Sequence, residues 1–235
     1  MSTWAAKRFW KVATAVEVGG GWSVELDGRG VRTPAKAPLV VPTRAMAEGI
    51  AAEWDAQEDK VDPTAMPITR SANAAIDKVT KQFDEVAEML AAYGDSDLLC
   101  YRATGPEALV ARQAARWDPL LDWAADVFGA RLAPVSGVIH APQEAQALAN
   151  LAARVSAFTP FELTAFHDLV SISGSLVLGL AATEGHMSAA ELWDLSRLDE
   201  TWQEEQWGED EDASAQAALK KQAFEHAIRF FRMCR

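Results

Sequence analysis

Two glutamates spaced four residues apart, Glu200 and Glu204, are the side chains best placed for chemistry in this sequence. Two carboxyl groups can divide the roles of general acid and general base in a hydrolytic reaction. A pair on one helix usually faces solvent, however, and the neighbouring sequence supplies neither a nucleophile nor an oxyanion donor. A small-molecule hydrolase that uses Glu200 and Glu204 is therefore the alternative hypothesis, and a protein without catalytic residues is favoured.

Other sequence signatures of catalysis or cofactor binding are missing from the chain. The four histidines have no HxxxH spacing of the kind that binds zinc, and Cys100 and Cys234 form no CxxC pair. There is no GxSxG, GxxxxGK[ST] or GxGxxG motif. The three glycines at 19–21 are interpreted as a turn. We therefore expect no metal site, no cofactor and no nucleotide requirement.

The two glutamates belong to an acidic segment, residues 199–212, which holds eight acidic residues and no Lys or Arg. Ser188 and Glu191 have the spacing of a capping box, which predicts a helix start, and Gly208 predicts the end of the helix. Placing residues at 100° intervals puts five side chains in one band beside an apolar stripe. They are Asp199, Glu200, Gln203, Glu204 and Trp207. The band is either a solvated acidic face or a recognition surface anchored by Trp207, because Trp is enriched at binding hot spots.

Composition limits the class of protein. A chain of 235 residues with 49% hydrophobic and 24% charged residues is typical of a soluble globular protein. The formal net charge of −12 disfavours nucleic acid and anionic membrane as partners. The longest uncharged stretch, residues 169–183, is shorter than the ~20 residues that a membrane span needs. No apolar signal-peptide core follows the N-terminus. These features favour an intracellular protein without membrane insertion.

The first part of the chain has the pattern of β structure. Alternating apolar residues from about 12 to 26 and the Asp27-Gly28 dipeptide predict antiparallel hairpins. Further strands are expected at 31–33 and 39–41. Thr43 then predicts the start of a covering helix that ends with Trp54, whose side chain we expect in the core. The prediction is a small antiparallel β unit, either a sheet or an open barrel, over residues 1–64.

The remainder, residues 65–235, has helical periodicity and predicts a larger all-helical domain, so that the fold class is α+β. We expect one helix from Thr69 to Gly94 and a second from Pro106 to Trp117. Asp118-Pro119 is then expected to start a third helix, which ends at Gly129. Two more are expected to begin at Pro142 and Pro160, the second running on through residue 181. The last two predicted helices are 188–207 and 209–231.

Eight sequence stretches together resemble one family. They are KRFWKVA (7–13), LDGRGVRTPAKAPLVVPT (26–43), AAEWDAQ (51–57), VDPTAMP (61–67), DLLCYRA (97–103), WDPLLDWA (117–124), GSLVLGLA (174–181) and LDETWQEEQWGEDED (198–212). In this order they resemble the F1-ATPase assembly chaperones, which bind the α subunit of ATP synthase. None of them is a catalytic fingerprint, and their specificity comes from their number and order.

The resemblance implies a non-enzymatic chaperone with an N-terminal β unit and a C-terminal helical domain. Such a protein would hold the unassembled F1 α subunit, prevent its aggregation and assist assembly of the α/β hexamer. Because the chain begins almost directly at KRFW, without an import segment, we expect a bacterial cytoplasmic protein rather than a processed form from the mitochondrial matrix.

The family pattern DExxQxxxWG also assigns expected roles to residues. We expect Glu200, Glu204 and Trp207 to contact the client, and Asp199 and Gln203 to brace their helix against its neighbours. Trp54, in the family pattern AEWD, is a further candidate, although a structural role is favoured. Charge reversal at Glu200 and Glu204 is expected to weaken capture of the α subunit with little change in thermal stability.

Overall fold

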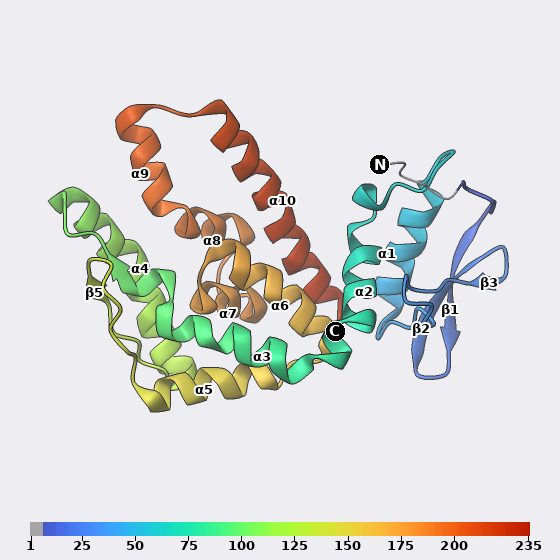
Figure 1. The fold of residues 1–235 in the computed structure, drawn as a ribbon, viewed down its shortest axis with the longest axis horizontal. Coiled ribbons are helices and arrows are strands. Elements are labelled where there is room, and N and C mark those ends of the chain that lie inside the picture. The colour runs from blue at the N-terminus through green and yellow to red at the C-terminus, as the bar shows by residue number, and fades with distance from the viewer. Residues whose placement is uncertain (1–6) are drawn as a thin grey trace. The chain divides into compact units, whose positions relative to one another are not determined.

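The computed structural model describes residues 7–235, which divide into two compact units (Figure 1). The first unit comprises the chain up to Phe83 together with residues 159–165 and 229–235. The second comprises residues 84–158 and 166–228. The first unit therefore extends beyond residue 64, and it also includes short segments from later helices.

The first unit is built on a three-stranded antiparallel sheet in the order β1 (Ala13–Val18), β2 (Gly21–Leu26) and β3 (Arg29–Gly30). Ala13 pairs with Leu26 and Val18 with Gly21. The predicted hairpin at Asp27-Gly28 is present. Both residues have positive φ, 48° and 80°, which the tight turn requires.

The third and fourth strands were predicted in the wrong place. The third strand, β3, precedes Val31, and residues 39–41 form only an isolated bridge between Trp22 and Val41. Those two residues exchange backbone hydrogen bonds of 2.8 and 2.7 Å. A second isolated bridge joins Arg32 to Pro38. Pro38 and Pro42 have no N–H to donate, which limits further pairing of this segment.

Helix α1 (Arg44–Asp55) packs on the sheet, as predicted. Thr43 caps it by accepting a 3.3 Å hydrogen bond from the backbone N–H of Met46. Met46 and Ile50 are fully buried, which places the apolar stripe of the helix in the core of this unit. Helix α2 (Pro67–Asp77) follows, after the short 3-10 helix η1 (Pro63–Ala65).

The second unit is mainly helical, and the predicted α+β class is confirmed. Its larger helices, some of which share residues with the first unit, are α3 (Phe83–Ala91), α4 (Glu107–Phe128), α5 (Ala145–Ser156), α6 (Pro160–Ser173), α7 (Leu176–Glu184), α8 (Ala189–Ser196), α9 (Leu198–Trp207) and α10 (Glu211–Met233). A two-residue parallel pair joins β4 (Tyr101–Arg102) to β5 (Val135–Ser136). The 3-10 helices are η2 (Val79–Lys81), η3 (Ala92–Ser96) and η4 (Leu98–Cys100). Helix α7 is buried from Leu176 to Thr183, so it forms the centre of this unit.

Three stretches predicted as single helices are interrupted. The chain breaks at Gly174, whose φ is 73°, and Ser175 then caps α7 by accepting a 3.0 Å bond from Leu178. It breaks again at Arg197, between α8 and α9, where φ is −111° and ψ is 13°. The helix expected from Thr69 to Gly94 ends at Asp77, and α3 begins only at Phe83. Apolar periodicity continues across these breaks, so periodicity alone could not locate them.

Two predicted helix starts were also wrong. Helix α4 continues through Pro119, although proline cannot donate the backbone hydrogen bond of its position. The loss of that bond costs less than exposing Trp117 and Leu120, which the continuous helix keeps buried. Asp118 forms a 2.8 Å ion pair with Arg102 and caps no helix. Helix α5 begins at Ala145 rather than at Pro142, because the Glu144 carboxylate accepts bonds from two backbone N–H groups.

Within residues 7–235, the helices are either too short or too polar for any of them to cross a lipid bilayer.

The start of α8 provides a test of pH-dependent stability. The Ser188 hydroxyl and N–H both donate to the Glu191 carboxylate, at 2.6 and 2.9 Å, and they hold the pKa of that carboxyl below its ordinary 4.5. A lowered pKa adds stability that is present above pH 4.5 and is lost as the pH falls through the folded-state pKa. We therefore expect wild type to exceed Glu191→Gln in melting temperature at pH 7. The difference should disappear on acidification, and a constant difference would contradict this assignment.

Candidate partner-binding surface

Apart from Trp54, the site residues predicted from the sequence lie on α9, which is a separate helix because the chain turns at Arg197. Asp199 and Glu200 occupy the first turn, where negative charge is favourable next to the unpaired N–H groups of a helix start. The helix ends at Gly208, whose φ of 88° suits glycine. Five residues of the predicted band are therefore on one short helix of the second unit.

Helix α9 is braced against α4 through a buried glutamine. The Gln113 amide donates a 2.7 Å hydrogen bond to the Asp199 carboxylate and accepts a 2.8 Å bond from the Ala103 N–H. Gln113 is only 1% exposed, and these two bonds satisfy both ends of its amide, as a buried polar group requires. Asp199 thus connects its helix to α4 through Gln113, and its role at a partner-binding site stays a prediction.

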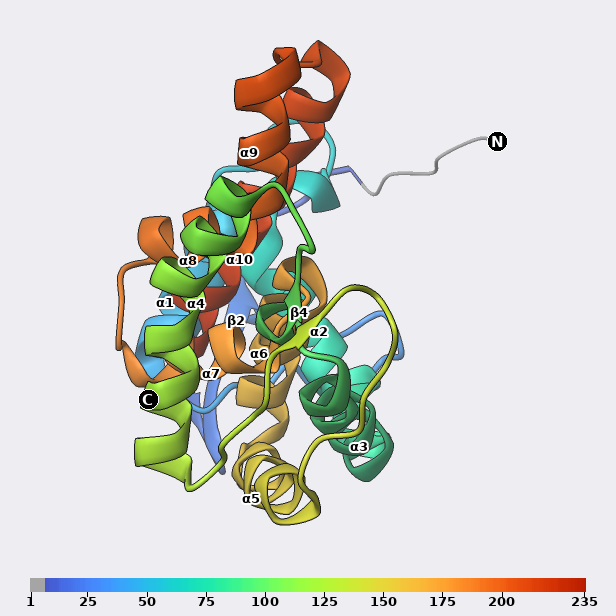
Figure 2. The ribbon, with the colours of Figure 1, turned by 90° about the vertical axis from the view of Figure 1, so that its left-hand side faces the viewer.

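A second brace joins the same two helices through an arginine. The Arg112 guanidinium lies 4.6 Å from the centre of the Trp202 ring and forms a 2.8 Å ion pair with Glu205. Both Figures 1 and 2 place the N-terminal half of α4 beside α9. Asp199, Trp202 and Glu205 therefore define the α4-facing side of α9.

Glu200 and Glu204 lie on another side of α9 and share one cation. Arg197 is 2.8 Å from a Glu200 oxygen and 3.4 Å from a Glu204 oxygen. The two carboxylates are thus held at neighbouring positions by a guanidinium. Because this cation contacts one carboxylate oxygen of each glutamate of the proposed pair, the hydrolase alternative gains no support from the geometry.

Trp207 ends the same side of the helix and is 79% exposed, a large apolar surface left in solvent. Gln203 is also exposed, and its proposed bracing role stays a prediction. Three carboxylates that follow, Glu209, Glu211 and Asp212, have no ion-pair partner within the described chain. The exposed surface of α9 and the 208–212 segment, here called the α9 surface, therefore combines one indole with unpaired negative charge.

Negative charge is concentrated in the unit that carries the α9 surface. The second unit contains 23 acidic and 8 basic side chains, a net charge of −15. The first unit has 11 acidic and 14 basic side chains, a net charge of +3. The field of the second unit therefore favours a partner with a basic contact surface.

Trp54 lies on α1 in the first unit and contacts a tryptophan that precedes the sheet. Its ring packs edge-on against Trp10, with 5.1 Å between ring centroids. The preceding Glu53 caps α2 through 2.7 and 2.8 Å bonds from the N–H groups of Ile68 and Thr69. Trp54 is half-buried instead of lying in the core, and its role stays a prediction.

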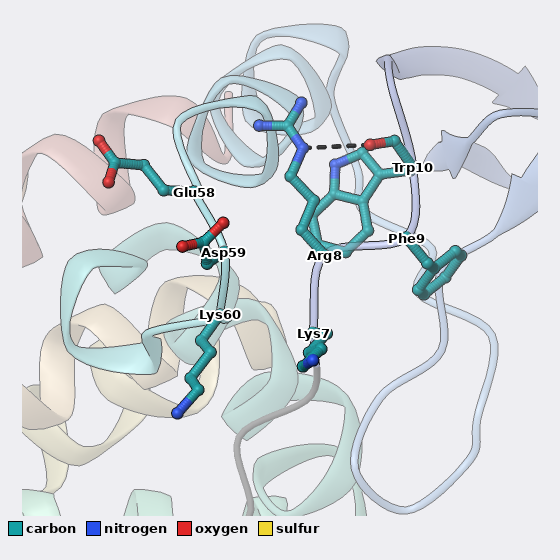
Figure 3. A pocket seen from close by; sticks show the side chains of 7 residues that line it. All are labelled: Lys7, Arg8, Phe9, Trp10, Glu58, Asp59 and Lys60. Carbon is teal, nitrogen blue, oxygen red and sulfur yellow. Dashed lines mark hydrogen bonds between the residues drawn. The ribbon is translucent and has the colours of Figure 1, made fainter.

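The first unit also has a pocket next to this tryptophan pair (Figure 3). Its lining residues are Lys7, Arg8, Phe9, Trp10, Glu58, Asp59 and Lys60. The Arg8 guanidinium is already bonded to backbone carbonyls, including those of Trp10 and Asp55 at 3.1 and 2.8 Å. Among the described residues, no group of His, Cys, Asp and Glu side chains is arranged to hold a metal ion.

The sequence-based site omitted three residues that position α9. Arg197 stands three and seven residues before the glutamates that it binds, so helical spacing could have indicated it. Arg112 and Gln113 come from α4, about 90 residues earlier, and no local sequence signal connects them with α9.

Comparison with known proteins decides the family. The sequence profile of the ATP12 chaperone protein family matches residues 7–125. The chain belongs to the ATP12 chaperone family.

Similar proteins extend this likeness beyond the matched half. The crystal structure of Atp12 from Paracoccus denitrificans is 52% identical and superimposes with a TM-score of 0.95, covering 98% of this chain and 99% of that one. The Atu1473 protein of Agrobacterium tumefaciens is 45% identical, with a TM-score of 0.93 and coverage of 97% and 86%. The mitochondrial protein atp12 of Schizosaccharomyces pombe is 26% identical over 220 residues, covering 88% of this chain and 75% of its own. The likeness to these solved structures therefore extends over both units.

Proposed function

We propose that this chain is an assembly chaperone for F1-ATPase that binds the unassembled α subunit, prevents its aggregation and assists formation of the α/β hexamer. Its membership of the ATP12 chaperone family supports a role in F1 assembly. The observation that carries the proposal is the α9 surface, where Trp207 is exposed beside unpaired carboxylates on a helix braced by α4.

The physical requirements of a temporary holder fit that surface. A subunit made without its partners exposes apolar surface, which drives self-association. A protein that covers it needs an aromatic anchor for affinity and a charged rim for orientation and rapid association. It must also be displaceable by the β subunit, so a single anchor on a short helix suits the task better than a large apolar interface.

The proposal is tested by diluting denatured bacterial F1 α subunit into buffer with and without this protein. We expect light scattering from aggregated α subunit to fall in proportion to the protein added, and the two chains to elute together in size-exclusion chromatography. Adding β subunit should release the α subunit. Unchanged aggregation and separate elution would contradict the proposed function.

Glu200 and Glu204 are predicted to contribute to capture. The double variant Glu200→Gln/Glu204→Gln should bind the α subunit several-fold more weakly while its melting temperature changes little, because exposed ion pairs contribute about 0–1 kcal/mol. Glutamine is preferable to charge reversal, because two lysines would be placed against Arg197 and would add repulsion of their own.

The matched control for this double variant is Glu85→Gln/Glu88→Gln. It also removes two carboxylates from the second unit, but from exposed positions on α3 that play no part in bracing α9. We expect this control to capture the α subunit nearly as well as wild type. Equal weakening by both double variants would indicate a general charge effect instead of direct contact by Glu200 and Glu204.

A further inference from the structure

Helix α10 has one face that is covered in only part of its length. The residues Ser214, Ala217, Lys221, Phe224 and Ile228 recur at alternating steps of three and four, so they share one side of the helix. Phe224 and Ile228 are buried, and the Phe224 ring packs against Trp193 of α8, with centroids 6.1 Å apart. The second half of this face is therefore part of the core of the second unit.

The first half of the same face is open. Over residues 211–223 no side chain is buried, and only Ser214, Ala217 and Lys221 are partly covered. These three residues are the inner face of α10. A helical segment as short as the first half of α10 would be marginal in water on its own. It is supported by its continuation into the buried half of α10 and by Asp210, which accepts a 2.8 Å bond from the Ala213 N–H.

Helix α9 presents its own free side near this inner face. Because α9 contacts α4 through Asp199, Trp202 and Glu205, the side with Glu204 and Trp207 points away from α4. In Figure 1, α9 lies between α4 and the first half of α10. The α9–α10 hairpin is defined as residues 198–223. On these sides of its two helices, Trp207 is exposed, and Glu204, Ser214 and Ala217 are only partly covered.

We propose that the α9–α10 hairpin docks a basic amphipathic helix of the client, and that the inner face of α10 is part of the contact. This inference rests on the proposed function, since the client is the F1 α subunit. Ala217 and Ser214 have small side chains, so a helix can approach α10 closely there. Trp207 supplies the apolar anchor on the opposite side. Recognition of an amphipathic helix by an apolar groove is a recurrent mode of binding.

Charge complementarity defines the chemistry of the docked helix. Glu209, Glu211 and Asp212 stand at the turn of the hairpin without an ion-pair partner in residues 7–235. Lys or Arg side chains at the end of the client helix that lies against this turn would pair with them, whereas a wholly acidic helix would be repelled. Lys221 lies further along α10, so the complementary basic side chains belong at the turn and not beside Lys221. We therefore expect capture to weaken as ionic strength rises.

Two matched substitutions test the docking face. Ala217→Trp fills the inner face of α10, whereas Ala215→Trp places the same side chain on the outer side of the same helix, where residue 215 is exposed. Both variants should keep the wild-type melting temperature. We expect Ala217→Trp to weaken binding of F1 α subunit by tenfold or more, and Ala215→Trp to remain within about twofold of wild type. Binding by Ala217→Trp equal to that of wild type would overturn the proposal.

Hydrogen exchange gives a second and independent measurement. In the free protein, amides of residues 211–223 should exchange much faster than those of 224–228, because only the latter are packed. Addition of F1 α subunit should slow exchange in 211–223. If wild type captures the α subunit but these amides stay unprotected, the docking inference fails and the proposed function stands. If wild type does not capture the α subunit at all, the proposed function fails as well.

Discussion

Trp207→Ala is expected to weaken capture of the F1 α subunit by about 30-fold or more. Aromatic hot spots commonly contribute 2 kcal/mol or more to binding, which corresponds to this factor. Trp207 is 79% exposed in the free protein, so its removal deletes no core contact. The free energy of unfolding should therefore remain within about 0.5 kcal/mol of wild type. Binding is measured by titrating fluorescently labelled α subunit, and stability by urea unfolding.

Leu219→Ala is the control for the loss of exposed apolar area. Leu219 is 59% exposed, on the opposite side of α10 from its inner face. The Leu219→Ala variant should therefore bind the α subunit with the affinity of wild type. If Trp207→Ala bound the subunit with unchanged affinity, Trp207 would be no anchor and the α9 surface would lose its main support.

Asp97→Ala is expected to lower the free energy of unfolding by about 3–5 kcal/mol, the largest effect on stability predicted here. The Asp97 carboxylate is fully buried and accepts 3.0 Å bonds from the N–H groups of Leu99 and Val177. It thereby joins η4 to the start of α7, 80 residues later in the chain. Each buried N–H left without an acceptor costs about 1–3 kcal/mol. Urea unfolding followed by circular dichroism measures the loss.

Asp62→Ala is a matched control, because Asp62 caps η1 through an equivalent 2.9 Å bond from Thr64 but is exposed. Water can replace that carboxylate, so we expect a loss of no more than about 1 kcal/mol. A loss for Asp97→Ala no larger than that for Asp62→Ala would show that the buried amides find other acceptors.

The pH dependence of Asp97 has the opposite sign to that of Glu191. Burial raises the pKa of Asp97 above its ordinary 3.8, although the amide donors of Val177 and Leu99 oppose the rise. A raised pKa means that the folded protein binds the proton more tightly, so the associated stability is lost as the pH rises through the folded-state pKa. The stability of wild type relative to Asp97→Asn should therefore decrease as the pH rises.

The parts of the fold that depend on neighbouring residues could be predicted from the sequence. The Ser188–Glu191 capping box, the Asp27-Gly28 hairpin and the Thr43 cap each depend on residues at most three positions apart. The periodic helices and the α+β class followed from the same kind of local pattern. Helix breaks at Gly174 and Arg197 did not, because an apolar stripe can continue through a change of direction.

The sequence by itself determined which residue types α9 and the following turn carry, since eight acidic residues and two tryptophans lie within residues 199–212. Only the tertiary structure decided which of them face a neighbour and which face solvent. Trp202 packs against Arg112 of α4, whereas Trp207, five residues later, is exposed. The physical reason is that Arg112 and Gln113 meet α9 from a helix about 90 residues away, and contacts over such a separation have no local sequence signature.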